Sequence, residues 1–280
     1  MNEEVWQRTV ATPVTLEGRG LHTGERVSMT ILPSGEDTGI VFRVVQNSRE
    51  TRIPARIEYA VLGPRSTALA KEGIVLQTVE HFLAACWGWG ITNTEVWVEG
   101  VELPGGDGSA LIFFEALARA GMVTQNKPCL TFPIRHVIRV GDTERGLFAF
   151  PADNVQVFYL LDATPRGTFF RGVQFREGDD FVRLAQARTF AFEWEISDIL
   201  KGGLGLGIRD EALVFDRWGQ SNHPLRDPQE AACHKILDFL GDLMLLGLRV
   251  QGGFLGIRSG HKLNQQMVEL LQREVKNGQG

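Results

Sequence analysis

The sequence of 280 residues is long enough for one large domain or two of ordinary size. Hydrophobic residues make up 43% of it and charged residues 22%, the balance of a globular protein with a sizeable core. A net charge of -5, with acids and bases interspersed, argues against nucleic-acid binding, which usually needs a basic stripe. Three widely spaced cysteines fit the reducing cytoplasm better than a disulfide framework, and neither a leader peptide nor a membrane span is predicted.

The order of predicted elements in the first half of the chain is strands, helix, strand, helix. Alternating, β-branched stretches predict strands over residues 5–18, 26–34, 39–45 and 92–100. Apolar segments predict helices over residues 78–90 and 107–122. Thr78 is the expected N-cap of the first of these helices, and glycines end both.

The second half repeats this order. Strands are predicted over residues 134–140, 147–152, 155–162 and 248–257, and helices over residues 230–246 and 260–275. The spacing supports a duplication, because His81 lies nine residues before Gly90 and Asp238 lies nine residues before Gly247.

We therefore predict an α+β fold with two similar lobes, residues 1–126 and 127–280. Each lobe is expected to be a small β-sheet covered by two α-helices, and the lobes to pack as a layered sandwich with the active site between them. The segment 121–129 would join the lobes. An aromatic and glycine-rich stretch at about residues 190–215 is predicted to be a hydrophobic insert in the second lobe.

A candidate metal site begins with His234 and Asp238, four residues apart on one face of the predicted helix 230–246. Zinc accepts nitrogen and oxygen donors, and a catalytic site needs three protein ligands. If the equivalent helices of the two lobes face each other, His81 completes the set and Glu80 becomes a candidate general base. The alternatives are a mutually bonded His–Asp pair, a buried histidine bonded to backbone, and an acid favoured by the helix dipole.

Two further residues fit this scheme. His261 follows a glycine at the start of the last predicted helix, at an exposed loop–helix junction. Asp242, one turn beyond Asp238, could keep that imidazole protonated for oxyanion stabilisation and for protonation of a leaving amine, or be an ordinary surface acid. Lys235 is expected to be solvated. Cys233, about 100° around the helix from His234, is expected to be structural.

An ordered set of motifs resembles a known family. The motifs are "GRGLHTGE", "TVEHFLAACWGWGITN", "ELPGGDGSA", "ARTFAF", "HKILDFLGDL" and "GHKLN", and they span nearly the whole chain. Together they are similar to the bacterial UDP-3-O-acyl-N-acetylglucosamine deacetylases, which carry out the committed step of lipid A synthesis. The resemblance implies a zinc-dependent hydrolase that removes the N-acetyl group from an acylated UDP-sugar.

The resemblance also implies a role for each candidate residue. The implied ligands of one Zn²⁺ are His81, His234 and Asp238. The implied catalytic residues are Glu80 as general base, His261 as general acid, Asp242 as its orienting partner, and Thr189 as a hydroxyl that helps bind the tetrahedral intermediate. The implied substrate-binding residues are Lys235, near charged groups of the substrate, and, along a passage for the acyl chain, Phe190, Phe192, Leu204 and Leu206. For these four apolar residues, ordinary core packing is an equal alternative.

Some positions depart from the family pattern. Cys233 stands where relatives usually have arginine, and the segment 204–215 lacks the usual serine and asparagine. These departures affect the expected acyl-length preference and nucleotide contacts, but not the implied ligands. An amidohydrolase acting on another acylated sugar, and a non-catalytic sugar-nucleotide or lipid-binding relative, stay open as alternatives. We expect a cytoplasmic monomer without a nucleic-acid partner, and at most transient contact with a membrane.

Overall fold

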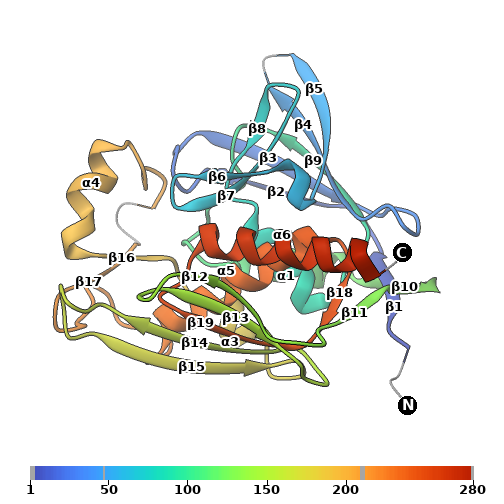
Figure 1. Ribbon diagram of the computed structural model, residues 1–280. Helices are drawn as coiled ribbons and strands as arrows, with labels where there is room; N and C mark the ends of the chain where they lie inside the picture. Colours follow the sequence, from blue (N-terminus) through green and yellow to red (C-terminus); the bar gives the residue numbers. More distant parts are fainter. Residues whose placement is uncertain (1–3, 47, 209–211, 279–280) are drawn as a thin grey trace.

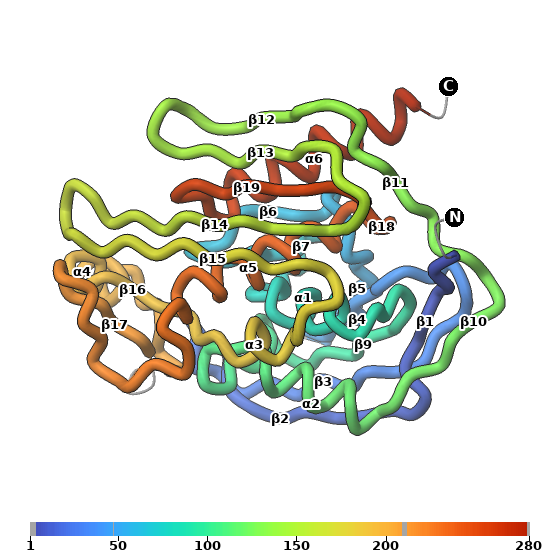
Figure 2. Tube along the Cα trace, turned by 90° about the horizontal axis from the view of Figure 1, so that it is seen from below, coloured from blue at the N-terminus to red at the C-terminus, as the bar shows by residue number. Residues whose placement is uncertain are grey.

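Two five-stranded sheets enclose a layer of helices in the computed structural model, which describes residues 4–46, 48–208 and 212–278 (Figure 1). The first sheet has the strand order β2 (Val14–Arg19), β3 (Arg26–Leu32), β9 (Thr94–Glu99), β4 (Ile40–Gln46) and β5 (Arg49–Pro54). The second has the order β12 (Ile138–Gly141), β13 (Gly146–Phe150), β19 (Gly253–Ile257), β14 (Gln156–Asp162) and β15 (Phe170–Arg176), seen from below in Figure 2.

The two sheets have the same topology. In each, the third strand in space comes last along the chain, pairs antiparallel with the second and pairs parallel with the fourth. The outer strands pair antiparallel on both sides. The predicted α+β fold with two similar lobes is therefore confirmed, whereas the boundary between residues 126 and 127 stays a prediction.

Four helices form the layer between the sheets. They are α1 (Glu80–Trp89) and α2 (Leu111–Ala120) from the first half, and α5 (Glu230–Leu243) and α6 (His261–Gly278) from the second. Helix α1 packs against α5 in the middle of the molecule, where the first seven residues of α1 and all residues of α5 except Lys235 are buried. Gly241 makes this close approach possible, because a Cβ there would lie 2.1 Å from the backbone oxygen of Glu80.

Smaller elements complete the fold around this core. A three-stranded sheet of β6 (Ala60–Gly63), β7 (Ser66–Lys71) and β8 (Ile74–Leu76) lies between the first sheet and α6 (Figure 1). Strand β1 (Trp6–Val10) pairs antiparallel with β10 (Met122–Pro128), and β11 (Thr131–Pro133) pairs parallel with β18 (Arg249–Gln251). Short helices are α3 (Val182–Ala185), η1 (Ile57–Tyr59) and η3 (Met244–Leu246). Within the described residues, no helix combines the length and the apolar character that crossing a membrane requires.

The predicted insert projects from one end of the molecule (Figure 1). It consists of β16 (Phe190–Phe192), η2 (Glu193–Glu195), α4 (Ile196–Lys201) and β17 (Leu213–Phe215), and its two strands pair in parallel. Residues 209–211 of the predicted range lie outside the described residues.

Four local predictions are wrong in detail. The segment 5–18 is two strands, β1 and β2, which belong to different sheets. The segment 248–257 is two strands rather than one, because the chain changes sheets at Gly252. The predicted strand over residues 134–140 begins only at Ile138. Thr78 does not cap α1; its backbone has a positive φ of 56°, and its hydroxyl donates to the carboxylate of Glu102, 2.8 Å away.

Candidate active site

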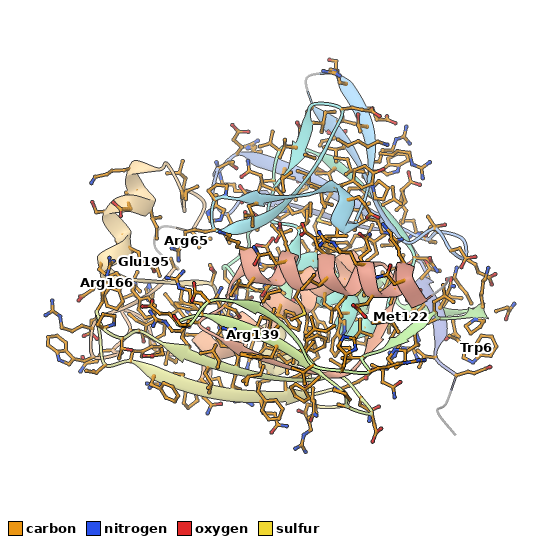
Figure 3. The ribbon with its side chains drawn as sticks, in the orientation of Figure 1. Trp6, Arg65, Met122, Arg139, Arg166 and Glu195 are labelled. Carbon is orange, nitrogen blue, oxygen red and sulfur yellow. The ribbon has the colours of Figure 1, made fainter. Side chains whose placement is uncertain are left out.

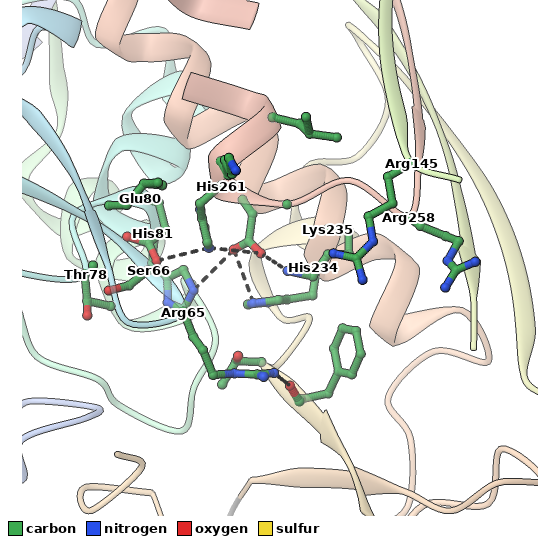
Figure 4. Close-up of a pocket in the computed structure, with 18 of the residues that line it drawn as sticks. Arg65, Ser66, Thr78, Glu80, His81, Arg145, His234, Lys235, Arg258 and His261 are labelled. Atoms are coloured by element: carbon green, nitrogen blue, oxygen red, sulfur yellow. Dashed lines mark hydrogen bonds and ion pairs between the residues drawn. The ribbon is translucent and has the colours of Figure 1, made fainter. Parts of the chain in front are cut away.

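Helices α1 and α5 bring His81, His234 and Asp238 together, as the sequence predicts. The two histidines are labelled in Figure 4. The Oδ1 atom of Asp238 lies 3.3 Å from Nε2 of His234 and 3.6 Å from Nε2 of His81. All three side chains are buried, and their potential ligand atoms lie within 4.8 Å of one another. A chain separation of about 150 residues is thus closed by the packing of two helices.

The protonation of this cluster suits a bound cation. Nδ1 of His234 lies 2.9 Å from the carbonyl oxygen of Ala187, which can only accept, so the proton sits on Nδ1 and Nε2 offers its lone pair. Burial lowers the pKa of His234 to about 3, which keeps the ring neutral. The lone pair therefore faces Oδ1 of Asp238, which has no hydrogen-bond donor among the described residues. Two facing acceptors in a buried site are stabilised by a shared metal ion.

The ionised state of Asp238 is also supported. Burial opposes its ionisation, but the adjacent His234, Lys235 and His261 side chains together hold the pKa of this carboxyl well below its usual range. Nζ of Lys235 lies 2.6 Å from Oδ2 of Asp238, and the lysine side chain is only 20% exposed. The expectation of a solvated Lys235 is therefore wrong, because the helix places it one turn before the buried carboxylate.

Glu80 opens α1 beside the cluster. Its Oε2 atom accepts a hydrogen bond of 3.1 Å from the backbone N–H of Thr67, while Oε1 lies 3.7 Å from Nε2 of His261. Burial raises the pKa of Glu80 to about 7, although the charges of His261 and His81 oppose this rise. A carboxyl group poised near neutrality has the proton affinity that general base catalysis needs.

His261 and Asp242 form a hydrogen-bonded pair on the other side of the cluster. Nδ1 of His261 lies 2.9 Å from Oδ2 of Asp242, which is fully buried and also accepts from Asn264 at 2.8 Å. Burial alone would lower the pKa of His261, but the carboxylates of Asp242, Asp238 and Glu80 outweigh it and raise that pKa to about 9. Asp242 is thus no surface acid, and His261, at 11% side-chain exposure, is less accessible than predicted.

A cavity of about 780 Å³ opens onto these residues. Besides the cluster it has five basic side chains in its lining: Arg65, Arg145, Lys235, Arg258 and Lys262. Arg65 lies in the turn between β6 and β7 and forms an ion pair of 3.0 Å with Glu195 of the insert, so the small sheet and the insert meet at this residue (Figure 3). A cavity with this lining suits a ligand that carries several negative charges.

The insert contributes only part of its predicted residues to this cavity. Thr189 and Phe190 line it, and the Phe190 ring lies 5.7 Å from Nζ of Lys235. Phe192 stacks instead on Trp194, with 4.6 Å between the ring centroids. Leu204 and Leu206 are likewise not part of the cavity lining in the described part of the chain, so their substrate-binding role stays a prediction.

Sequence reasoning missed several residues of the cavity. His22 lines it within the "GRGLHTGE" turn, where the buried Glu102 accepts from the backbone N–H groups of His22 and Thr23 at 2.9 Å each. A histidine in a glycine-rich turn could have indicated from the sequence that His22 is a candidate site residue. Arg65 had no such signal, because only long-range packing brings it to the cavity. Thr67, which bonds to Glu80 and Asp242 without lining the cavity, had none either.

Cys233 is a packing residue, in agreement with the sequence analysis. Its side chain is fully buried in α5, and burial raises the pKa of its thiol to about 12, so it offers no thiolate at neutral pH. Cys233 is accordingly not among the side chains of the candidate metal cluster.

A buried two-histidine, one-carboxylate cluster with an adjacent acid and base, held between two similar α+β lobes, defines the class of hydrolytic metalloenzymes. The comparison with known families specifies the class further. The family model described as "LpxC: UDP-3-O-acyl N-acetylglycosamine deacetylase" matches residues 7–273, and the chain belongs to this family.

Individual relatives agree with the family model. A protein of Thermodesulfovibrio yellowstonii is 32% identical over 98% of this chain and 93% of its own length. One from Saccharophagus degradans is 36% identical over 96% of this chain and 91% of its own length. One from Coxiella burnetii is 34% identical over 95% of this chain and 89% of its own length. Each is named UDP-3-O-acyl-N-acetylglucosamine deacetylase.

Proposed function

We propose that this protein is a zinc-dependent hydrolase that removes the N-acetyl group from UDP-3-O-acyl-N-acetylglucosamine, giving acetate and the free amine. This is the committed step of lipid A synthesis. Family membership supports the substrate, and the arrangement of acid, base and buried donor cluster supports the reaction. The main observation in support of this proposal is the position of Glu80 and His261, which come from opposite halves of the chain. Oε1 of Glu80 and Nε2 of His261 lie 3.7 Å apart beside that cluster.

The zinc ion would be held by His81, His234 and Asp238. Their donor types, burial and unpaired lone pairs fit the ion, as argued above. When bound, zinc supplies Lewis acidity, which polarises a carbonyl group and makes water more acidic. Lys235 would help keep Asp238 ionised through its ion pair of 2.6 Å.

The protein side chains then divide the proton transfers. Glu80, as general base, takes a proton from the attacking water through Oε1, since Oε2 is already bonded to the backbone. His261, protonated because Asp242 raises its pKa, stabilises the negative oxygen of the tetrahedral intermediate. The same imidazolium gives its Nε2 proton to the departing amine as the C–N bond breaks. Thr189 would donate its hydroxyl to the same oxygen from the cavity wall.

The remaining parts of the substrate would use the rest of the cavity. Lys235, with the neighbouring Arg65 and Arg258, would bind the diphosphate, because charge-assisted hydrogen bonds to phosphate oxygens are strong. The 3-O-acyl chain would follow the insert along Phe190, Phe192, Leu204 and Leu206. We place the enzyme in the cytoplasm as a monomer that has at most transient contact with the membrane.

Acetate release from acylated UDP-N-acetylglucosamine tests this proposal. We expect turnover that a chelator abolishes and one equivalent of zinc restores. Simple N-acetyl sugars without the nucleotide or the acyl chain should react far more slowly. Equal rates on simple N-acetyl sugars would assign the chain to an amidohydrolase of another substrate, and no metal-dependent turnover on either would make it a binding protein.

A further inference from the structure

Thr67 connects the two halves of the active site. It lies on β7, its side chain is fully buried, and its hydroxyl group faces the second half of the chain. Oγ1 donates to Oδ1 of Asp242 at 2.6 Å and lies 3.3 Å from Nδ1 of His261. Nε2 of Gln265 donates back to Oγ1 at 3.2 Å. One hydroxyl thus contacts α5 and α6 at the residues that orient the proposed general acid.

The donors and acceptors around this hydroxyl fix its direction. A threonine hydroxyl has one proton to donate, and an ionised carboxylate can only accept, so that proton points at Asp242. The Gln265 amide occupies one acceptor position of the hydroxyl. With Oδ1 bonded to Thr67, the Oδ2 atom of Asp242 is left to accept from Nδ1 of His261. The Nε2 atom of His261 then faces Glu80 and Asp238, 3.7 and 3.8 Å away.

The backbone of Thr67 acts on the proposed general base. Its N–H donates to Oε2 of Glu80, and its carbonyl oxygen accepts from the N–H of Val79, 3.2 Å away, immediately before α1. The strand therefore anchors the first turn of α1 and leaves Oε1 of Glu80 as the free oxygen. The backbone of Thr67 therefore holds the proposed base, Glu80, from the first half of the chain. Its side chain holds Asp242, the partner of the proposed acid, from the second half.

We infer that Thr67 is a positioning residue that aligns the Glu80 base with the Asp242–His261 pair across the two halves of the protein. The inference rests on the proposed function, because it assigns a role within that reaction. Loss of the hydroxyl would leave Oδ1 of Asp242 without this donor in a buried site, so the carboxylate and the imidazole would no longer be held in one orientation. Substrate contacts elsewhere in the cavity would be unaffected.

Three substitutions test the inference. Thr67→Val keeps the shape and removes the hydroxyl, and we expect kcat to fall by about 10-fold to 100-fold with KM unchanged, as for other groups that orient a catalytic residue. Thr67→Ser restores the hydroxyl and should recover most of the wild-type kcat. Thr94→Val is the matched control, because it deletes a buried hydroxyl that donates to the Leu32 carbonyl at 2.8 Å on β9, and kcat should not change. Metal content should equal that of the wild type in all three.

A double-mutant cycle separates positioning from general damage. In the Asp242→Asn background the hydroxyl has lost its charged acceptor, so adding Thr67→Val should cause little further loss of kcat. The metal-free Thr67→Val and Thr94→Val proteins should both be folded at the assay temperature, which a thermal melt of each checks. The inference is overturned by an unchanged kcat in Thr67→Val, by a Ser variant no better than Val, by metal loss, or by additive effects with Asp242→Asn. A failure of the proposed function differs visibly, because the wild type itself would then release no acetate.

Discussion

Helices α1 and α5 occupy equivalent places in the two halves, yet they carry different chemistry. Helix α1 ends at Gly90, and α5 with the following turn η3 ends at Gly247. Both glycines have a left-handed backbone, with φ values of 66° and 71°. His81 and Asp238 stand at equivalent distances from these glycines, and both belong to the candidate metal cluster. The remaining polar residues have no counterpart in the other helix.

This difference separates scaffold from site. The shared topology explains why two helices meet face to face, because each must bury an apolar surface against its own sheet and against its twin. The asymmetry explains the chemistry: α1 adds a base in its first turn, whereas α5 adds His234 and Asp242 one turn either side of Asp238. A symmetric pair of helices would hold an ion but would lack a distinct acid and base. The following predictions test this division.

The largest effect is expected from removing Asp238, the proposed carboxylate ligand on α5. Asp238→Ala should abolish both metal binding and turnover, because the cluster loses its only carboxylate and Lys235 loses its partner. Metal analysis of the purified variant measures this. Asp227→Ala is the control and should keep its metal. It removes a carboxylate that lies outside the cavity lining and forms an ion pair of 2.8 Å with Arg183. Full metal occupancy in Asp238→Ala would refute the ligand assignment.

The proposed general base and general acid should matter for turnover alone. Glu80→Gln and His261→Ala should each keep the metal while kcat falls by about 10²-fold to 10⁴-fold, the usual contribution of a general acid or base. Single-turnover acetate release together with metal content checks both. Near-normal deacetylation by either variant would show that its assigned role is wrong.

The pH dependence should report the same two groups. Glu80 must be ionised and His261 protonated, so kcat/KM should rise as the pH passes about 7 and fall again above about 9. Asp242→Asn removes the largest interaction that raises the pKa of His261, so the falling limb should move to lower pH. A pH–rate profile of both proteins measures this shift. An unmoved falling limb would mean that another group, rather than His261, controls it.

The smallest effects are expected at the apolar positions of the two helices. Cys86 in α1 and Cys233 in α5 are both fully buried, and burial raises the pKa of both thiols. Cys86→Ala and Cys233→Ala should each lower the free energy of unfolding by about 1 kcal/mol, without loss of metal or activity. Denaturant titration gives this value. Metal loss in Cys233→Ala alone would contradict the structural role of that cysteine.

Much of the fold and the site could be predicted from the sequence. Helix periodicity located α1 and α5, and the spacing of His81 and Asp238 to their glycines indicated the duplication. What local pattern could not give is long-range pairing. The burial of Asp242, the ion pair of Lys235 with Asp238, and the hydrogen bond from Thr67 to Asp242 all depend on which segments pack together. The break between β18 and β19 at Gly252 could not be predicted for a related reason. The sequence on either side of Gly252 has a strand pattern, and only the sheet to which the strand belongs differs.

The most direct test of the account is to locate the metal. Crystals grown with zinc should give one anomalous peak per chain at the zinc edge, about 2.0–2.2 Å from Nε2 of His81, Nε2 of His234 and a carboxylate oxygen of Asp238. A peak elsewhere, or none at zinc concentrations that support turnover, would contradict the central claim that two equivalent helices share one catalytic ion.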